Sequence, residues 1–123
     1  GVISRTVPGV EHHKVAAILA YEAGIGVRNG CFCAQPYIFS LLNLDRSAIA
    51  ALKATAQQGD TWDIPGLVRI SLGCYNTVAE IDATVEALER VARGEYQGRY
   101  VKGPHGHYQP EGHNVNWSQY FNL

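Results

Sequence analysis

The sequence has no methionine, only three cysteines, and charged residues at only 17% of its 123 positions. No apolar run approaches the roughly 18 residues that a helix needs to cross a bilayer, so no membrane span is expected. Ten Lys and Arg against eleven Asp and Glu leave a net charge of −1, so no basic field is present to hold nucleic acid. Hydrophobic residues make up 46% of the chain, which excludes overall disorder and suits one domain with its own core.

The odd number of cysteines argues against a secreted disulfide scaffold and favours a reducing compartment, which predicts a cytoplasmic protein. Residue 1 is a glycine at the start of a strand-like segment, and no initiator methionine is present. We therefore expect the chain to be a piece of a larger protein. The alternative is a short protein whose first methionine was removed.

Apolar periodicity and turn residues predict short strands and helices in alternation. Gly24 and Gly94 suit the position just after a helix, Asp45 suits a helix N-cap, and Thr77 with Glu80 forms a capping-box pattern. We expect strands at 1–7, 25–28 and 67–73, helices at 10–23, 36–44, 46–58 and 77–93, and a turn-rich link at 60–66.

This order predicts an α+β fold of two layers, in which a short, mostly antiparallel sheet carries the helices on one face. The pattern ends near Gly94, and we assign residues 1–94 to the domain. Residues 95–123 are rich in glycine, proline and aromatic residues without periodicity. We expect them to form an ordered arm that packs on this domain or on a partner.

The densest potential chemistry is the loop that holds Cys31 and Cys33. A cysteine reacts as its thiolate, whose formation is favoured near a cation or a helix N-terminus. Cys33 has both nearby in sequence, since Arg28 precedes it and a helix is expected from Pro36. The alternative is that both cysteines are small buried residues, the commoner fate of free cysteine. A disulfide between the two would be strained if they pointed to opposite sides.

A zinc site built from Cys31, Cys33, Cys74 and a histidine is not expected, because paired structural ligands are usually separated by two or more residues and no second pair is present. Arg69 lies in the strand Leu-Val-Arg-Ile-Ser-Leu, where an arginine must find an anion or reach water. The planar guanidinium group of Arg69 suits a carboxylate. The alternative is an ordinary surface arginine whose guanidinium reaches water, and the sequence alone does not separate the two. No lysine has a pocket-like context, and we expect Lys14 to point to solvent.

The chain resembles the C-terminal small domain of class V aminotransferase-fold enzymes that use pyridoxal phosphate (PLP, fold type I), and within them the cysteine desulfurase and selenocysteine lyase group. That group carries an Arg-x-Gly-x-x-Cys-Ala-x-Pro loop after a Gly-Ile-x-Val strand, matched here at 24–36. It also carries an Arg-x-Ser strand that leads to Tyr-Asn-Thr, matched here at 69–77. The resemblance covers about residues 1–94.

The resemblance implies that Cys33 is the persulfide-forming nucleophile, that Arg69 binds the substrate α-carboxylate, and that Arg28 lies beside the substrate. Asn76 and Thr77 would shape the turn into the last helix. It further implies a homodimeric parent enzyme that acts on a cysteine-like amino acid. In the family a large domain supplies the Schiff-base lysine and most of the PLP site. We therefore expect no cofactor-binding residues here, and an inactive fragment.

The loop departs from the desulfurase pattern, which commonly has histidines where this chain has Cys31 and Phe32. The Gly-Cys-Phe-Cys run instead resembles molybdenum-cofactor sulfurases, another branch of the fold. Two alternatives therefore stay open. The parent could be an aminotransferase, lyase or epimerase in which Cys33 is a bystander, or the chain could be a stand-alone α+β binding module.

Overall fold

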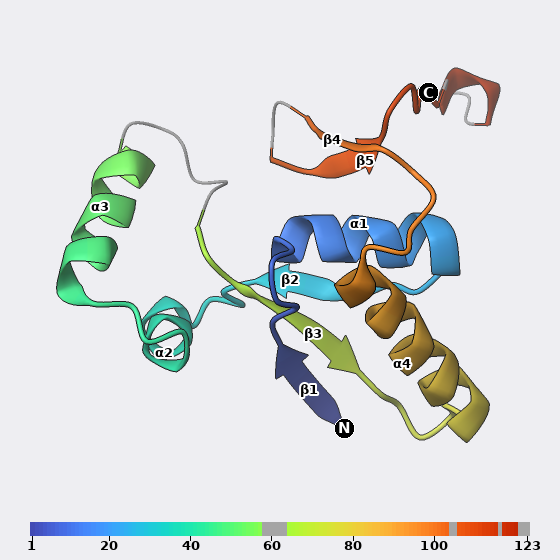
Figure 1. Ribbon diagram of the computed structural model, residues 1–123, viewed down its shortest axis with the longest axis horizontal. Helices are drawn as coiled ribbons and strands as arrows, with labels where there is room; N and C mark the ends of the chain where they lie inside the picture. Colours follow the sequence, from blue (N-terminus) through green and yellow to red (C-terminus); the bar gives the residue numbers. More distant parts are fainter. Residues whose placement is uncertain (58–63, 104–105, 116, 121–123) are drawn as a thin grey trace.

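A three-stranded antiparallel sheet forms the centre of the computed structural model, which describes residues 1–57, 64–103, 106–115 and 117–120. The strand order is β1 (Val2–Arg5), β3 (Leu67–Ser71), β2 (Arg28–Gly30). Helices α1 (His12–Ala23) and α4 (Val78–Arg93) pack on one face of the sheet (Figure 1). The predicted α+β fold with helices on one face is thus confirmed.

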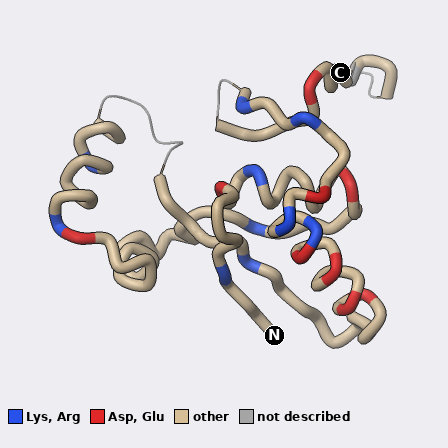
Figure 2. Tube along the Cα trace, viewed as in Figure 1, with Lys and Arg blue, Asp and Glu red and all other residues tan. Residues whose placement is uncertain are grey.

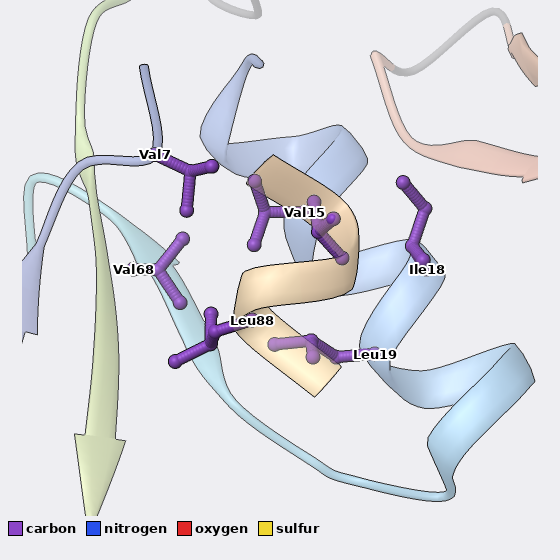
Figure 3. Packing of buried hydrophobic residues seen from close by; sticks show 7 residues of the cluster. Val7, Val15, Ile18, Leu19, Val68 and Leu88 are labelled. Carbon is purple, nitrogen blue, oxygen red and sulfur yellow. The ribbon is translucent and has the colours of Figure 1, made fainter. Parts of the chain in front are cut away.

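The core lies between this face and the two helices. Val68 of β3 is fully buried, and its side chain points toward residues of α1 and α4 (Figure 3). The cluster consists of Val7, Val15, Ile18, Leu19, Val68, Leu88 and Val91. Because neighbouring strand residues point to opposite faces, burial of Val68 places Arg69 on the face away from these helices.

The glycine caps and the capping box form as predicted. Gly24 and Gly94 end α1 and α4 in the left-handed conformation, at φ 66° and 72°. Thr77 and Glu80 make both reciprocal bonds of the capping box at the start of α4. Helix α1 begins at His12 rather than at residue 10, because the Val10 amide closes a turn onto the carbonyl of Val7.

The predicted strand at 25–28 lies three residues too early. The amide of Ile25 bonds to the carbonyl of Leu19 and completes the end of α1, so the chain joins the sheet only at Arg28. Ile25 and Val27 still pack against the core. The helix expected from 36 to 44 is α2 (Gln35–Leu41), and it ends early where Asn43 adopts φ 53°.

Helices α2 and α3 (Arg46–Gln57) project away from the α1–α4 layer (Figure 1). Asp45 caps α3 as predicted, since its Oδ1 accepts a 2.7 Å bond from the Ala48 amide. Helix α3 contains no fully buried residue. Its predicted end at 58 and most of the link at 60–66 fall outside the described residues.

After α4 the chain turns back over α1. Strands β4 (Tyr100–Lys102) and β5 (Tyr108–Pro110) form a hairpin beside α1, followed by a short 3-10 helix, η1 (Trp117–Gln119) (Figure 1). Acidic residues gather along α4, whereas basic residues are spread over several elements (Figure 2). Within the described residues, no helix is long and apolar enough to cross a membrane.

Candidate functional site

A tight turn presents Cys33 to solvent at the end of β2. The Ala34 amide donates a 2.8 Å hydrogen bond to the carbonyl of Cys31, and the two central residues, Phe32 and Cys33, have φ values of 52° and 62°. Positive φ at both central positions is the mark of a type I′ turn, which usually holds glycine or asparagine. A bulky residue pays a backbone cost here, and such strain clusters at functional sites.

Cys31 is held differently from Cys33. Its Sγ donates a 3.2 Å hydrogen bond to the carbonyl of Pro65, and its side chain is half-buried. Burial raises the pKa of the Cys31 thiol, because it disfavours the charged thiolate. The adjacent backbones also touch, because a β-carbon at Gly66 would lie 2.6 Å from the Cα of Gly30. One side of the loop is therefore fixed to the chain before β3, while Cys33 is exposed.

The sheet brings the two candidate arginines together. Arg28 of β2 is paired in register with Arg69 of β3, so both side chains leave the same face, away from the core. Like charges directly opposite one another are destabilising unless an anion lies between them. Arg69 makes no ion pair with a carboxylate of the described residues, and its buried Nε has no hydrogen-bond partner.

The guanidinium of Arg69 instead lies over the ring of Phe32, with its Cζ 5.1 Å from the ring centre. This contact folds the Cys31–Ala34 turn toward the arginine face of the sheet. Arg69, Phe32 and the neighbouring Cys33 are thereby joined in one local structure, with Arg28 across the ladder. Two neighbouring guanidinium groups are suited to bind a small carboxylate.

Two residues of this arrangement were not predicted. Phe32 was noted only as a departure from the family pattern, and no spacing rule indicates that its ring meets Arg69. Ser4 of β1 is paired with Arg69 from the other side. Ser4, Arg69 and Arg28 therefore form one row across the sheet, which follows from strand register and not from sequence separation.

Other candidate residues lie elsewhere. Cys74 follows β3, at the opposite end of that strand from the Cys31 loop. No three or more His, Cys, Asp or Glu side chains in the described ranges are grouped to hold a metal ion. Asn76 shapes the turn before α4, as predicted, by accepting a 2.8 Å bond from the Gly73 amide.

None of the three lysines is placed to act as the Schiff-base lysine that PLP requires. Lys14, expected in solvent, is half-buried with its Nζ 5.0 Å from the ring centre of Tyr96. Lys102 lies 3.9 Å from a carboxylate oxygen of Glu11, and Lys53 is exposed on α3. All three are on elements other than the strands and turn that hold Arg28, Arg69 and Cys33. By themselves the described residues do not fit PLP.

Comparison with known proteins identifies relatives of this chain. Residues 1–84 match the family model described as aminotransferase class-V. The chain is 36% identical over 92 residues to a probable cysteine desulfurase of Methanothermobacter thermautotrophicus, covering 75% of this chain and 18% of that protein. It is 29% identical over 89 residues to a probable cysteine desulfurase of Vibrio cholerae, covering 72% of this chain and 17% of that protein. The chain thus spans less than a fifth of the length of these curated relatives, and no solved structure matches it significantly.

Proposed function

Because the chain belongs to the class V aminotransferase family, we propose that it works as the small domain of a PLP-dependent, cysteine desulfurase-like enzyme. In this proposal the parent enzyme removes sulfur from L-cysteine and carries it as a persulfide on Cys33. The observation that carries the proposal is the in-register pair Arg28 and Arg69, with the Cys33 turn folded against Arg69 through Phe32.

The arginine pair supplies the carboxylate site. A guanidinium binds a carboxylate through two parallel N–H bonds, and a second arginine opposite it adds charge without competing for the same fork. Arg69 is half-buried in the central strand, which fixes its position, whereas Arg28 is exposed at an edge strand. We assign the main clamp to Arg69 and a supporting role to Arg28.

The exposed turn supplies the sulfur acceptor. Cys33 lies at the second central position of the turn, where its thiol is open to both a substrate and a later sulfur acceptor. As a thiolate it would attack the sulfur of the substrate. The new sulfur–sulfur bond forms as the carbon–sulfur bond of cysteine breaks, and the electron pair of the broken bond stays with the carbon fragment, which takes up a proton and leaves as alanine. PLP, bound mainly by the large domain, would supply the delocalisation of that electron pair. The name "probable cysteine desulfurase" of both relatives supports L-cysteine as the substrate.

PLP would be bound mainly by residues outside this chain, since Lys14, Lys53 and Lys102 lie on elements other than those that hold the site. We therefore propose that a large domain of the same polypeptide completes the enzyme and that the 123-residue chain alone is inactive. The parent is expected to be a homodimer, as the family resemblance implies. A cytoplasmic setting agrees with the three free thiols of Cys31, Cys33 and Cys74.

The test is sulfide release from L-cysteine by the full-length parent, measured with reductant for wild type, Cys33→Ala and Cys74→Ala. Cys74 is a matched control because it is also an exposed cysteine, at the other end of β3. We expect wild type and Cys74→Ala to release sulfide, and Cys33→Ala to bind PLP but release none. Undiminished release by Cys33→Ala would overturn the persulfide role. A silent wild type with bound PLP would favour an aminotransferase, lyase or epimerase.

A further inference from the structure

We propose that Phe32 is a positioning residue for Arg69. Its aromatic ring holds the Arg69 guanidinium in the place where it binds the substrate carboxylate. The inference deepens the proposed function and rests on it for the identity of the substrate. Phe32 departs from the family pattern, and this role explains why an aromatic residue at this position contacts Arg69.

The contact joins the Arg69 guanidinium to the face of the Phe32 ring. The Cζ of Arg69 lies 5.1 Å from the centre of the Phe32 ring, and both residues are half-buried. An aromatic face attracts a guanidinium at this distance. No carboxylate of the described residues pairs with Arg69, so the ring takes the place that an acidic partner usually has.

A neutral ring suits a site that must bind and release an anion. A carboxylate partner would occupy the N–H fork and oppose a second carboxylate, whereas a ring covers the flat face and leaves the edge donors free. The Nε of Arg69 is buried and has no hydrogen-bond partner among the described residues, so no protein acceptor already occupies this donor. Phe32 thereby restricts the arginine without neutralising it.

The backbone links this restraint to the nucleophile. Phe32 and Cys33 are the two central residues of one turn, both at positive φ. Cys31 fixes the start of that turn through its 3.2 Å bond to the Pro65 carbonyl. The ring contact thus restrains Arg69 and, through the shared turn, the backbone of the next residue, Cys33.

The experiment compares two variants. Phe32→Leu keeps the apolar bulk but loses the aromatic face, whereas Phe32→Tyr keeps the aromatic face. The full-length enzyme is assayed for KM and kcat with L-cysteine, and for the Kd of unreactive L-alanine by calorimetry. A loss of cation–π restraint predicts roughly a threefold to tenfold rise in KM and Kd for Phe32→Leu. Phe32→Tyr should remain within about twofold of wild type.

Two further readouts separate positioning from general damage. The preference for L-cysteine over cysteamine, which lacks the carboxylate, should shrink in Phe32→Leu but not in Phe32→Tyr. Phe32→Leu should also cause no further loss in an Arg69→Ala background, because the two residues act through one contact. A change in kcat alone, or equal weakening of cysteine and cysteamine, would overturn the inference.

The outcome distinguishes this inference from the proposed function. If wild type releases no sulfide but Phe32→Leu still weakens L-alanine binding, the positioning role holds and the desulfurase assignment fails. If wild type releases sulfide and Phe32→Leu binds L-alanine normally, the positioning role fails alone. If wild type binds no amino acid, both fail.

Discussion

The hydroxyl of Tyr100 donates a 3.1 Å hydrogen bond to Oε1 of Glu22, a residue 78 positions earlier in the chain. The same carboxylate accepts bonds from the amides of Gln97 and Gly98, at 3.1 and 3.0 Å. One side chain at the end of α1 therefore holds the segment that leads into the β4–β5 hairpin.

Removal of this carboxylate should release the start of the arm. We expect Glu22→Ala to lower the free energy of unfolding by about 1 to 2 kcal/mol, because three donors lose their charged acceptor. Urea denaturation measures the change, and faster amide exchange at Gln97 and Gly98 locates it. Glu89→Ala removes an exposed i,i+4 pair with Arg93 and should leave stability unchanged. Equal effects of both variants would contradict the anchoring role.

The same contact should depend on pH at both extremes. Burial acts to raise the pKa of Glu22, but bonds from Gly98, Gln97 and Tyr100 lower it below its ordinary value overall. A lowered carboxyl pKa contributes stability that is lost as pH falls through the folded-state value. Burial, and then the bond to Glu22, raises the pKa of Tyr100 to about 12. This contribution is present below the ordinary tyrosine pKa and is lost as pH rises toward 12.

Backbone NMR shifts of Gln97 and Gly98 test this dependence. They should titrate in acid with a midpoint below that of an ordinary glutamate, and the transition should vanish in Glu22→Ala. A midpoint at or above the ordinary value would show that burial outweighs the hydrogen bonds.

The sequence predicted the ends of several helices, because a helix cap depends only on residues within about one turn of it. Gly24, Gly94 and the Thr77–Glu80 box act within one turn and form as expected. The predicted strand at 25–28 was wrong because the Ile25 amide bonds back to the end of α1. The pattern of β-branched residues does not reveal that this amide bonds to the helix and not to a neighbouring strand. Val85 of α4 is another example, because a valine in an amphipathic helix usually faces the core, yet this side chain is 49% exposed.

The candidate site was predictable only in part, for a similar reason. The motifs indicated Arg28, Cys33 and Arg69 separately, and their roles stay predictions. Their juxtaposition depends on the register between β2 and β3, which joins residues 41 positions apart in sequence (69 − 28). The contact of Phe32 with Arg69 depends on the positive φ values of Phe32 and Cys33 in the turn, a conformation that neither of these two residue types favours.

The three cysteines should react at different rates with a thiol reagent. Cys31 is half-buried, its thiol bonds to the Pro65 carbonyl, and burial raises its pKa. Cys33 and Cys74 are exposed. Brief treatment with iodoacetamide at neutral pH, followed by peptide mass spectrometry, should therefore modify Cys31 several-fold more slowly than the other two. Faster labelling of Cys31 would mean that the turn is not held against Pro65.

The capping box offers a direct measure of how much α4 contributes. Thr77 Oγ1 accepts a 3.3 Å bond from the Glu80 amide, so Thr77→Ala should cost about 1 kcal/mol of unfolding free energy. Thr84→Ala is the matched control, because its hydroxyl only bonds back to the Glu80 carbonyl within the helix. Thermal or urea unfolding compares the two. A larger loss for Thr84→Ala would contradict the assignment of the cap.

The pair Arg28 and Arg69 should lower the stability of the folded protein but favour binding of a carboxylate. With no anion between them, Arg28 and Arg69 repel one another across the ladder, so Arg28→Gln should raise the free energy of unfolding by a few tenths of a kcal/mol. The gain should be larger at low salt than at 0.5 M NaCl, because salt screens exposed charges. The same substitution in the full-length enzyme should weaken L-alanine binding. Arg5→Gln is the control, since Arg5 is also exposed but is paired with Val68 and not with a charge. If Arg28→Gln destabilises the protein at low salt while Arg5→Gln does not, the two guanidinium groups do not repel, and the argument for an anion between them fails.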